Sequence, residues 1–228
     1  MLNKKRLTKN LMYLFFMVFI IEVSAEYFVF KPLILMFKPL IPLVIIMMYL
    51  FESEIKSKIY VLIMFLSLVT NLLFIPNTNQ ALFYALLVFT LHRILLIIFI
   101  LKMNKKTDFV PLIIATLPFL IVFSYLYFET PTFPENNSIL LIVQNVLISI
   151  FAGISLSGYV MNDNKQNSIL LISALLFVLL QFSVFIEKFY LQNEYSQVLR
   201  PLSMSLNAMA FFSFYRYVIE AEKQLNNN

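Results

Sequence analysis

The sequence has no cysteine, no tryptophan, two glycines and one histidine among its 228 residues. Without cysteine the chain can form no disulfide, no thiolate nucleophile and no cysteine-ligated metal site. Two glycines leave no material for a glycine-rich phosphate loop, and a lone histidine excludes a metal site built from several histidines. We therefore expect neither a metal nor a cofactor.

Charge is also scarce: 13% of the residues are charged and 61% are hydrophobic, with a mean hydropathy of +0.86. Soluble domains typically have about 25% charged and about 45–50% apolar residues. The composition is that of an integral membrane protein. In such a protein a net charge of +5 reflects lysines kept at the cytoplasmic face, so we expect no nucleic-acid partner.

Long apolar runs occupy most of the chain. Crossing the hydrocarbon core takes about 20 apolar residues in a helix, and helices are the spanning structure that continuous runs favour. The sequence predicts an all-α transmembrane bundle of about eight helices in a single domain, 1–228. The predicted spans are 11–28, 32–51, 59–75, 81–101, 110–128, 139–160, 169–187 and 198–219.

Basic residues are distributed unevenly over the two sides of these spans. If the N-terminus is inside, four basic residues face outward: Lys31, Lys38, Lys188 and Arg200. Twelve face inward: Lys4, Lys5, Arg6, Lys9, Lys56, Lys58, Lys102, Lys105, Lys106, Lys165, Arg216 and Lys223. This bias predicts a multi-pass protein of the cell membrane with both termini in the cytoplasm.

The N-terminus allows a second interpretation. "MLNKKRLTKN", an apolar run and "VSA" at 23–25 imitate a signal peptide that is cleaved after Ala25. Cleavage would leave seven spans with their orientation unchanged. The acidic Glu22 beside the apolar run and the continuation of that run to Phe28 favour an uncleaved first span.

The letters Phe-Lys-Pro-Leu occur twice, at 30–33 and 37–40. A helix that starts at Pro32 spans the membrane, and the two later prolines of "KPLIPL" then bend it. Lys38 lies about two turns deeper than Lys31, where a lysine needs a partner or a wet cavity. We predict that Lys38 pairs with Glu22 and Lys31 with Glu26; the alternative is that each ammonium snorkels to the headgroups.

Further polar residues lie inside the predicted spans. Such groups usually hydrogen-bond between helices or line a ligand path. They are Asn71, His92, Arg93, Gln144, Asn145, Gln181 and Asn207. His92 is either a structural imidazole or a general acid or base. The chain lacks the G-x-S-x-G, H-E-x-x-H and Walker motifs, so the residues alone predict a polar-lined bundle and no reaction.

Three short stretches resemble the YhhN-like membrane proteins, known as lysoplasmalogenases. "KPLIPL" from Lys38 is similar to a lysine-proline-leucine motif that opens the second span, and "FTLHRIL" places His92 where the family has its histidine. "SALLFVLLQF", 173–182, is similar to a third motif at Ala174 and Phe177. The resemblance covers nearly the whole chain. It implies an eight-span bundle that hydrolyses the vinyl-ether bond of lysoplasmalogens and releases an aldehyde.

The chain departs from the family at two acidic positions. Thr70-Asn71 stands where the family has a Gly-Asp pair, and Leu180-Gln181 stands where it has Ser-Asp. An amide keeps hydrogen bonding but shuttles no protons at ordinary pH. Protonating an enol ether needs an acid, which leaves Glu22, Lys38 and His92 as catalytic candidates. Asn71, Gln181 and Asn207 are then candidates for binding a lysophospholipid-like membrane lipid.

Three functions therefore remain open. The chain is a vinyl-ether hydrolase or a descendant of one, a non-catalytic binder or transporter of lipids or small molecules, or a structural partner in a membrane complex. Convergence of the polar residues on one cavity favours the first two over a set of separate helix contacts.

Overall fold

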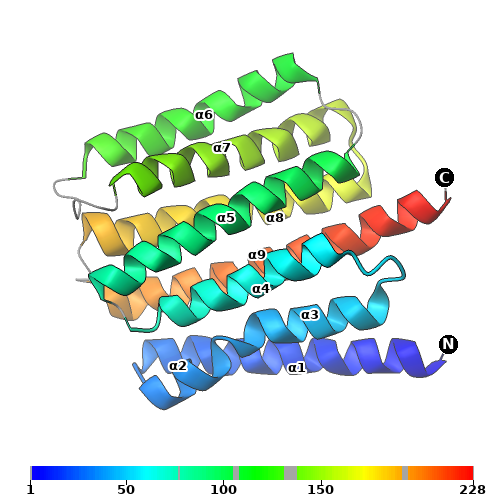
Figure 1. The fold of residues 1–228 in the computed structure, drawn as a ribbon, viewed down its shortest axis with the longest axis horizontal. Coiled ribbons are helices and arrows are strands. Elements are labelled where there is room, and N and C mark those ends of the chain that lie inside the picture. Colours follow the sequence, from blue (N-terminus) through cyan, green and yellow to red (C-terminus); the bar gives the residue numbers. More distant parts are fainter. Residues whose placement is uncertain (1, 77, 105–107, 131–137, 192–194, 228) are drawn as a thin grey trace.

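The computed structural model describes residues 2–76, 78–104, 108–130, 138–191 and 195–227, which form helices that run side by side along one axis (Figure 1). No strand occurs among them. The predicted all-α bundle is confirmed. The helices are α1 (Leu2–Tyr27), α2 (Lys31–Phe37), α3 (Leu40–Glu52), α4 (Lys58–Leu73), α5 (Asn79–Met103), α6 (Phe109–Phe128), α7 (Ser138–Met161), α8 (Lys165–Phe185), the π-helical segment η1 (Ile186–Tyr190) and α9 (Ser196–Asn227).

The described helices make eight antiparallel passes if α2 is counted with α3 and α8 with η1. Six of these passes are long and apolar enough to cross a membrane. Helix α4 is shorter, with 16 residues or about 24 Å, and α9 has 32 residues and a polar C-terminal part. Both termini lie at the same end of the bundle (Figure 1). We call this the inner end and the opposite one the outer end; their assignment to the two sides of a membrane stays a prediction.

Helix starts follow from local capping. The side chain of Thr78 accepts a hydrogen bond from the Ala81 amide at 3.2 Å, and that of Asn164 accepts one from the Asn167 amide at 2.8 Å. Each cap satisfies an amide that has no partner inside the helix. The polar stretches around these residues therefore end one pass and begin the next.

Helix α9 lies at the centre of the packing, in contact with α1, α3 and α8. Near its C-terminus, Glu222 accepts hydrogen bonds from Tyr49 and Ser53 of the α3 end, both at 2.6 Å. These contacts fix the inner end of the bundle. Farther outward, its buried face alternates small and aromatic side chains, namely Ala208, Ala210, Phe211, Phe214 and Tyr217.

Helix α6 packs on α7 and exposes most of its other side chains. Its exposed residues are large and apolar, including Phe109, Ile113, Ile114, Ile121 and Phe128. A helix of this kind is compatible with lipid and not with water. The chain is therefore an integral membrane protein.

Candidate functional site

The second pass is broken at Lys38 and Pro39, between α2 and α3. A proline has no amide hydrogen, so Pro42 cannot donate the helical hydrogen bond to the Lys38 carbonyl. Asn71 of α4 supplies a donor instead, because its Nδ2 lies 3.3 Å from that oxygen. Asn207 of α9 donates in turn to Asn71 Oδ1 at 3.4 Å. The prolines were predicted to bend one helix, and the structure instead interrupts it between α2 and α3. Side-chain amides join this break to α4 and α9.

The side chain of Lys38 forms an ion pair inside the bundle. Its Nζ lies 2.6 Å from Glu26 Oε1, and the two side chains are only 10% and 3% exposed. The predicted pairing of Lys38 with Glu22 is therefore wrong, and so is that of Lys31 with Glu26. Helix α1 ends at Tyr27 and α2 begins at Lys31. This short connection brings Lys38 level with Glu26 and not with Glu22, which lies one turn earlier on α1. Lys31 is exposed.

A cavity of about 790 Å³ lies between α2, α4, α5, η1 and the neighbouring parts of α8 and α9. Four of the predicted site residues line it: Lys38, Asn71, Gln181 and Asn207. Its other lining is mostly apolar and aromatic, including Phe74, Leu86, Phe89, Phe185, Met204 and Phe211. The polar side chains thus converge on one hollow, and Lys31 and Val29 lie at its exposed rim.

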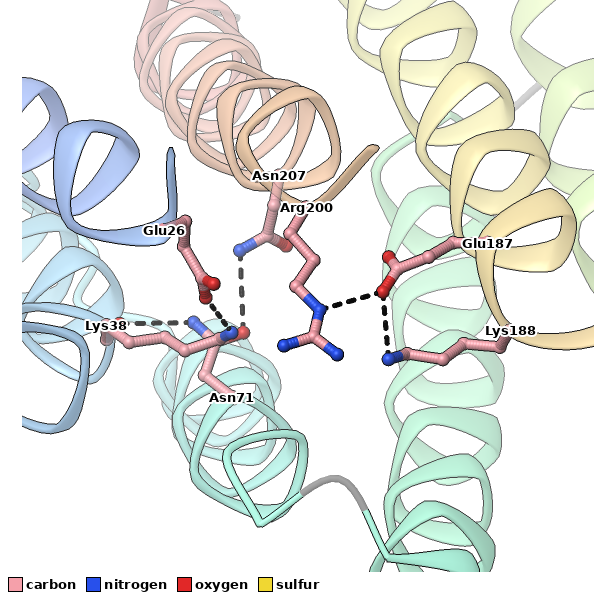
Figure 2. A network of polar contacts seen from close by, with 7 residues as sticks. All are labelled: Glu26, Lys38, Asn71, Glu187, Lys188, Arg200 and Asn207. Carbon is pink, nitrogen blue, oxygen red and sulfur yellow. Dashed lines mark hydrogen bonds and ion pairs between the residues drawn. The ribbon is translucent and has the colours of Figure 1, made fainter. Parts of the chain in front are cut away.

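A second ionic cluster faces Lys38 and Glu26 across this cavity (Figure 2). Glu187 of η1 accepts from Lys188 Nζ at 2.9 Å and from Arg200 Nε at 3.0 Å. The Glu187 and Lys188 side chains are 3% and 9% exposed, and that of Arg200 is 27% exposed. The cluster joins the end of α8 to the start of α9.

Gln181 belongs to a polar layer deeper in the bundle. Its Oε1 accepts from Arg93 Nη2 at 2.8 Å, and its Nε2 donates to Asn145 Oδ1 at 3.3 Å. Arg93 also donates to the Gln144 carbonyl at 3.1 Å and lies over the Phe89 ring. The layer ties α5, α7 and α8 together, and of its polar members Gln181 reaches the cavity.

Two predicted catalytic residues do not reach the cavity. His92 is fully buried beside the rings of Phe89 and Phe211, and its ring nitrogens have no hydrogen-bond partner among the described residues. Glu22 is fully buried one turn before Glu26. Both lie behind residues that line the cavity.

The sequence analysis missed the acidic part of the site. It assigned Glu26 to Lys31, counted Lys188 and Arg200 only as outward-facing basic residues, and left Glu187 out. Two signals were available: the charged pair inside the apolar "FIEKFY" at 185–190, and the seven-residue spacing of Arg200 and Asn207, which places both on one helix face.

The charges of the site do not balance. Among the lining residues that the structure describes, two carboxylates, Glu26 and Glu187, face four cations: Lys31, Lys38, Lys188 and Arg200. The hollow therefore combines apolar walls with a net charge of +2 when all six groups are ionised.

One family of known proteins matches the sequence. The YhhN family model matches residues 33–212, which is 180 of the 228 residues. The chain belongs to the YhhN family. No curated protein and no solved structure matched it significantly. The matched region includes most of the residues that line the cavity, from Ile34 to Phe211, whereas Glu26, Val29, Lys31 and Pro32 precede it.

Proposed function

We propose that this membrane protein binds single-chain ether phospholipids in the cavity and hydrolyses their vinyl-ether bond. The supporting observation is the convergence of Lys38, Asn71, Gln181 and Asn207 on one mostly apolar hollow in a member of the YhhN family. A volume of about 790 Å³ lies in the usual range of small-ligand pockets, about 300–1,000 Å³.

The reaction needs a proton donor at the enol ether. Protonation of the outer vinyl carbon gives an oxocarbenium ion, water adds to it, and the hemiacetal collapses to an aldehyde and the glycerol hydroxyl. Glu26 is the carboxyl that reaches the cavity beside Lys38. Glu22 lies one turn earlier on α1, fully buried and outside the cavity lining, so Glu26 is the proposed proton donor.

Aldehyde release tests this function. Protein purified in an uncharged detergent is given a vinyl-ether lysophospholipid, and its saturated ether analogue serves as the substrate control. We expect aldehyde from the vinyl ether alone, and a loss of about 100-fold or more in Glu26→Gln, since general acids contribute about 10²–10⁴-fold. Glu220→Gln is the matched control, because Glu220 pairs with Lys165 at the inner end. Absence of aldehyde would refute hydrolysis.

A second candidate is lipid binding without hydrolysis. The amide of Asn71 donates to a backbone carbonyl and that of Gln181 accepts from Arg93, so the two positions where the family has acids make structural contacts here. A protein that binds the saturated ether lipid in the cavity and releases no aldehyde from the vinyl ether would fit this candidate.

We further propose that the protein resides in the cell membrane with its cavity near the outer leaflet. The cavity lies at the outer end of the bundle, beside the end of α1, the start of α2 and η1. The excess of basic residues at the opposite end supports a cytoplasmic inner end. The lipid ligand then enters from the outer side.

A further inference from the structure

Arg200 has hydrogen-bonding capacity that its contacts with the described residues do not use. Its Nε donates to Glu187, and the structure gives its two terminal amino groups no acceptor among the described residues. In Figure 2 these groups point into the space between the Glu26–Lys38 pair and the Glu187–Lys188 pair. A guanidinium presents its donors as a planar fork that matches two oxygens of a phosphate.

The two lysines beside this space are largely buried. Lys38 and Lys188 are 10% and 9% exposed in their side chains. Lys38 pairs with Glu26, and Glu187 accepts from both Lys188 and Arg200, so these last two cations share one carboxylate. The partly buried guanidinium of Arg200, which shares its carboxylate with a second cation, favours a further anion beside it.

We propose that Arg200, flanked by Lys38 and Lys188, binds the phosphate of an anionic single-chain phospholipid. This rests on the proposed function and specifies its head group. Among the described residues that line the cavity, both carboxylates already pair with cations, so neither is open to a choline or ethanolamine ammonium. The site therefore selects a head group with net negative charge, such as a phosphate monoester or phosphoglycerol, over a zwitterionic one.

The same placement orients the lipid. Arg200 precedes Asn207 by seven residues on α9, so it lies about 10 Å nearer the outer end. With the phosphate at Arg200, the alkyl chain runs inward along the aromatic lining, which includes Phe89 and Phe211. The ether oxygen, one glycerol unit from the phosphate, then lies near Lys38 and Glu26.

Binding of non-hydrolysable probes tests the phosphate site. The full chain in dodecyl maltoside is titrated with four ligands: saturated 1-O-alkyl lysophosphatidate, the matching lysophosphatidylcholine, the matching alkylglycerol, and inorganic phosphate. We expect lysophosphatidate to bind at least tenfold more tightly than alkylglycerol and several-fold more tightly than the choline lipid. We expect Arg200→Gln to lower the affinity for lysophosphatidate at least tenfold and to leave the affinity for alkylglycerol unchanged.

Three further variants keep the test decisive. Arg200→Lys keeps the positive charge but not the planar, two-pronged set of donors, and we expect its affinity for lysophosphatidate to fall several-fold. Lys31→Gln changes an exposed residue of the cavity rim, so this variant remains usable even if Arg200→Gln does not fold. We expect its affinity for lysophosphatidate to fall twofold to fivefold. Arg216→Gln is the matched control, because Arg216 is an exposed residue farther along the same helix, and it leaves every affinity unchanged.

Each outcome has a definite meaning. Equal affinity for lysophosphatidate and alkylglycerol overturns the site, and so does wild-type lysophosphatidate affinity in Arg200→Gln. Equal binding of the choline lipid overturns the selectivity. Inorganic phosphate that binds as tightly as lysophosphatidate, with the same dependence on Arg200, supports the phosphate site and overturns a lipid as its source. Arg200-dependent lipid binding without aldehyde from the vinyl ether leaves the site standing and refutes the hydrolysis.

Discussion

Asn71 stands where the resemblance to the YhhN-like proteins implies an aspartate. Its side-chain amide is both a hydrogen-bond donor and a hydrogen-bond acceptor. It donates to the Lys38 carbonyl and accepts from Asn207. An ionised aspartate could accept but not donate. The amide therefore suits a break at which proline has removed the helical donor.

Asn71→Asp tests this interpretation. We expect the variant to lose about 1–3 kcal/mol of unfolding free energy, because a buried carbonyl loses its donor and faces a carboxylate. Unfolding in an uncharged detergent measures the loss. Asn79→Asp, at the exposed start of α5, is the control and should lose nothing. A stable Asn71→Asp variant with higher hydrolytic activity would contradict the interpretation and favour a catalytic position.

The ion pair of Lys38 predicts a second effect. Removing either partner of a buried pair leaves a charge without compensation, at a cost of about 3–5 kcal/mol. Lys38→Met combined with Glu26→Gln should therefore be much less unstable than the sum of the single variants. Lys38→Met with Glu22→Gln is the comparison and should show weaker coupling. Additive losses for Lys38 and Glu26 would contradict the pairing.

The sequence predicted the kind of contact at Lys38 but not its partner. A lysine deep in an apolar span needs a counter-charge or water, which follows from solvation alone. Glu22 and Glu26 are one turn apart on the same face, and the choice between them depends on the turn between α1 and α2. Residue patterns do not encode that offset of a few ångströms.

At the scale of helices, the pair α6 and α7 depends on one glycine. A methyl group added at Gly153 would lie 1.9 Å from Thr116 Oγ1 and 3.1 Å from the Thr116 Cα. The backbone atom cannot move aside without moving the helix.

Gly153→Ala should therefore destabilise the protein by about 1–3 kcal/mol, the usual cost of overpacking. The chain supplies its own control, since a methyl group at Gly158 meets only Asn167 Oδ1 at 3.9 Å. Gly158→Ala should be neutral or slightly stabilising, because alanine favours a helix over glycine. Unfolding measured side by side gives the comparison, and equal stability of the two variants would contradict the close approach.

Hydropathy located the spans because length and apolarity are local properties. It placed the second span at 32–51, and the structure has α2 and α3 there. It ended the seventh at residue 187, whereas the helical segments α8 and η1 continue to Tyr190. That continuation carries Glu187, whose contact with Arg200 joins it to α9.

At the scale of the whole molecule, the even number of passes places both termini on one side. Because the chain has no cysteine, single cysteines give labelling without background. Lys223→Cys at the inner end and Gln80→Cys at the outer end are both at exposed positions. We expect a membrane-impermeant thiol reagent to label Gln80→Cys on intact cells and Lys223→Cys only after permeabilisation. The reverse pattern would invert the orientation, and labelling of both would contradict the topology.

The cavity itself could not be derived from the sequence. Its walls come from helices far apart in the chain, and the contacts of Asn71 with Asn207 and of Arg93 with Gln181 link residues 136 and 88 positions apart. Polar residues in apolar spans indicated an interior face for each helix. Which faces meet is decided by packing.

Photo-cross-linking tests most directly whether a single-chain phospholipid occupies this cavity. A saturated ether lysophospholipid with a diazirine on its alkyl chain is irradiated with the purified protein, and the labelled residues are mapped by mass spectrometry. We expect labels on the cavity-lining residues Phe89, Phe185, Met204 and Phe211, displaced by excess unlabelled lipid. Labels that concentrate on the exposed residues of α6, such as Ile113 and Ile121, and resist displacement would contradict it.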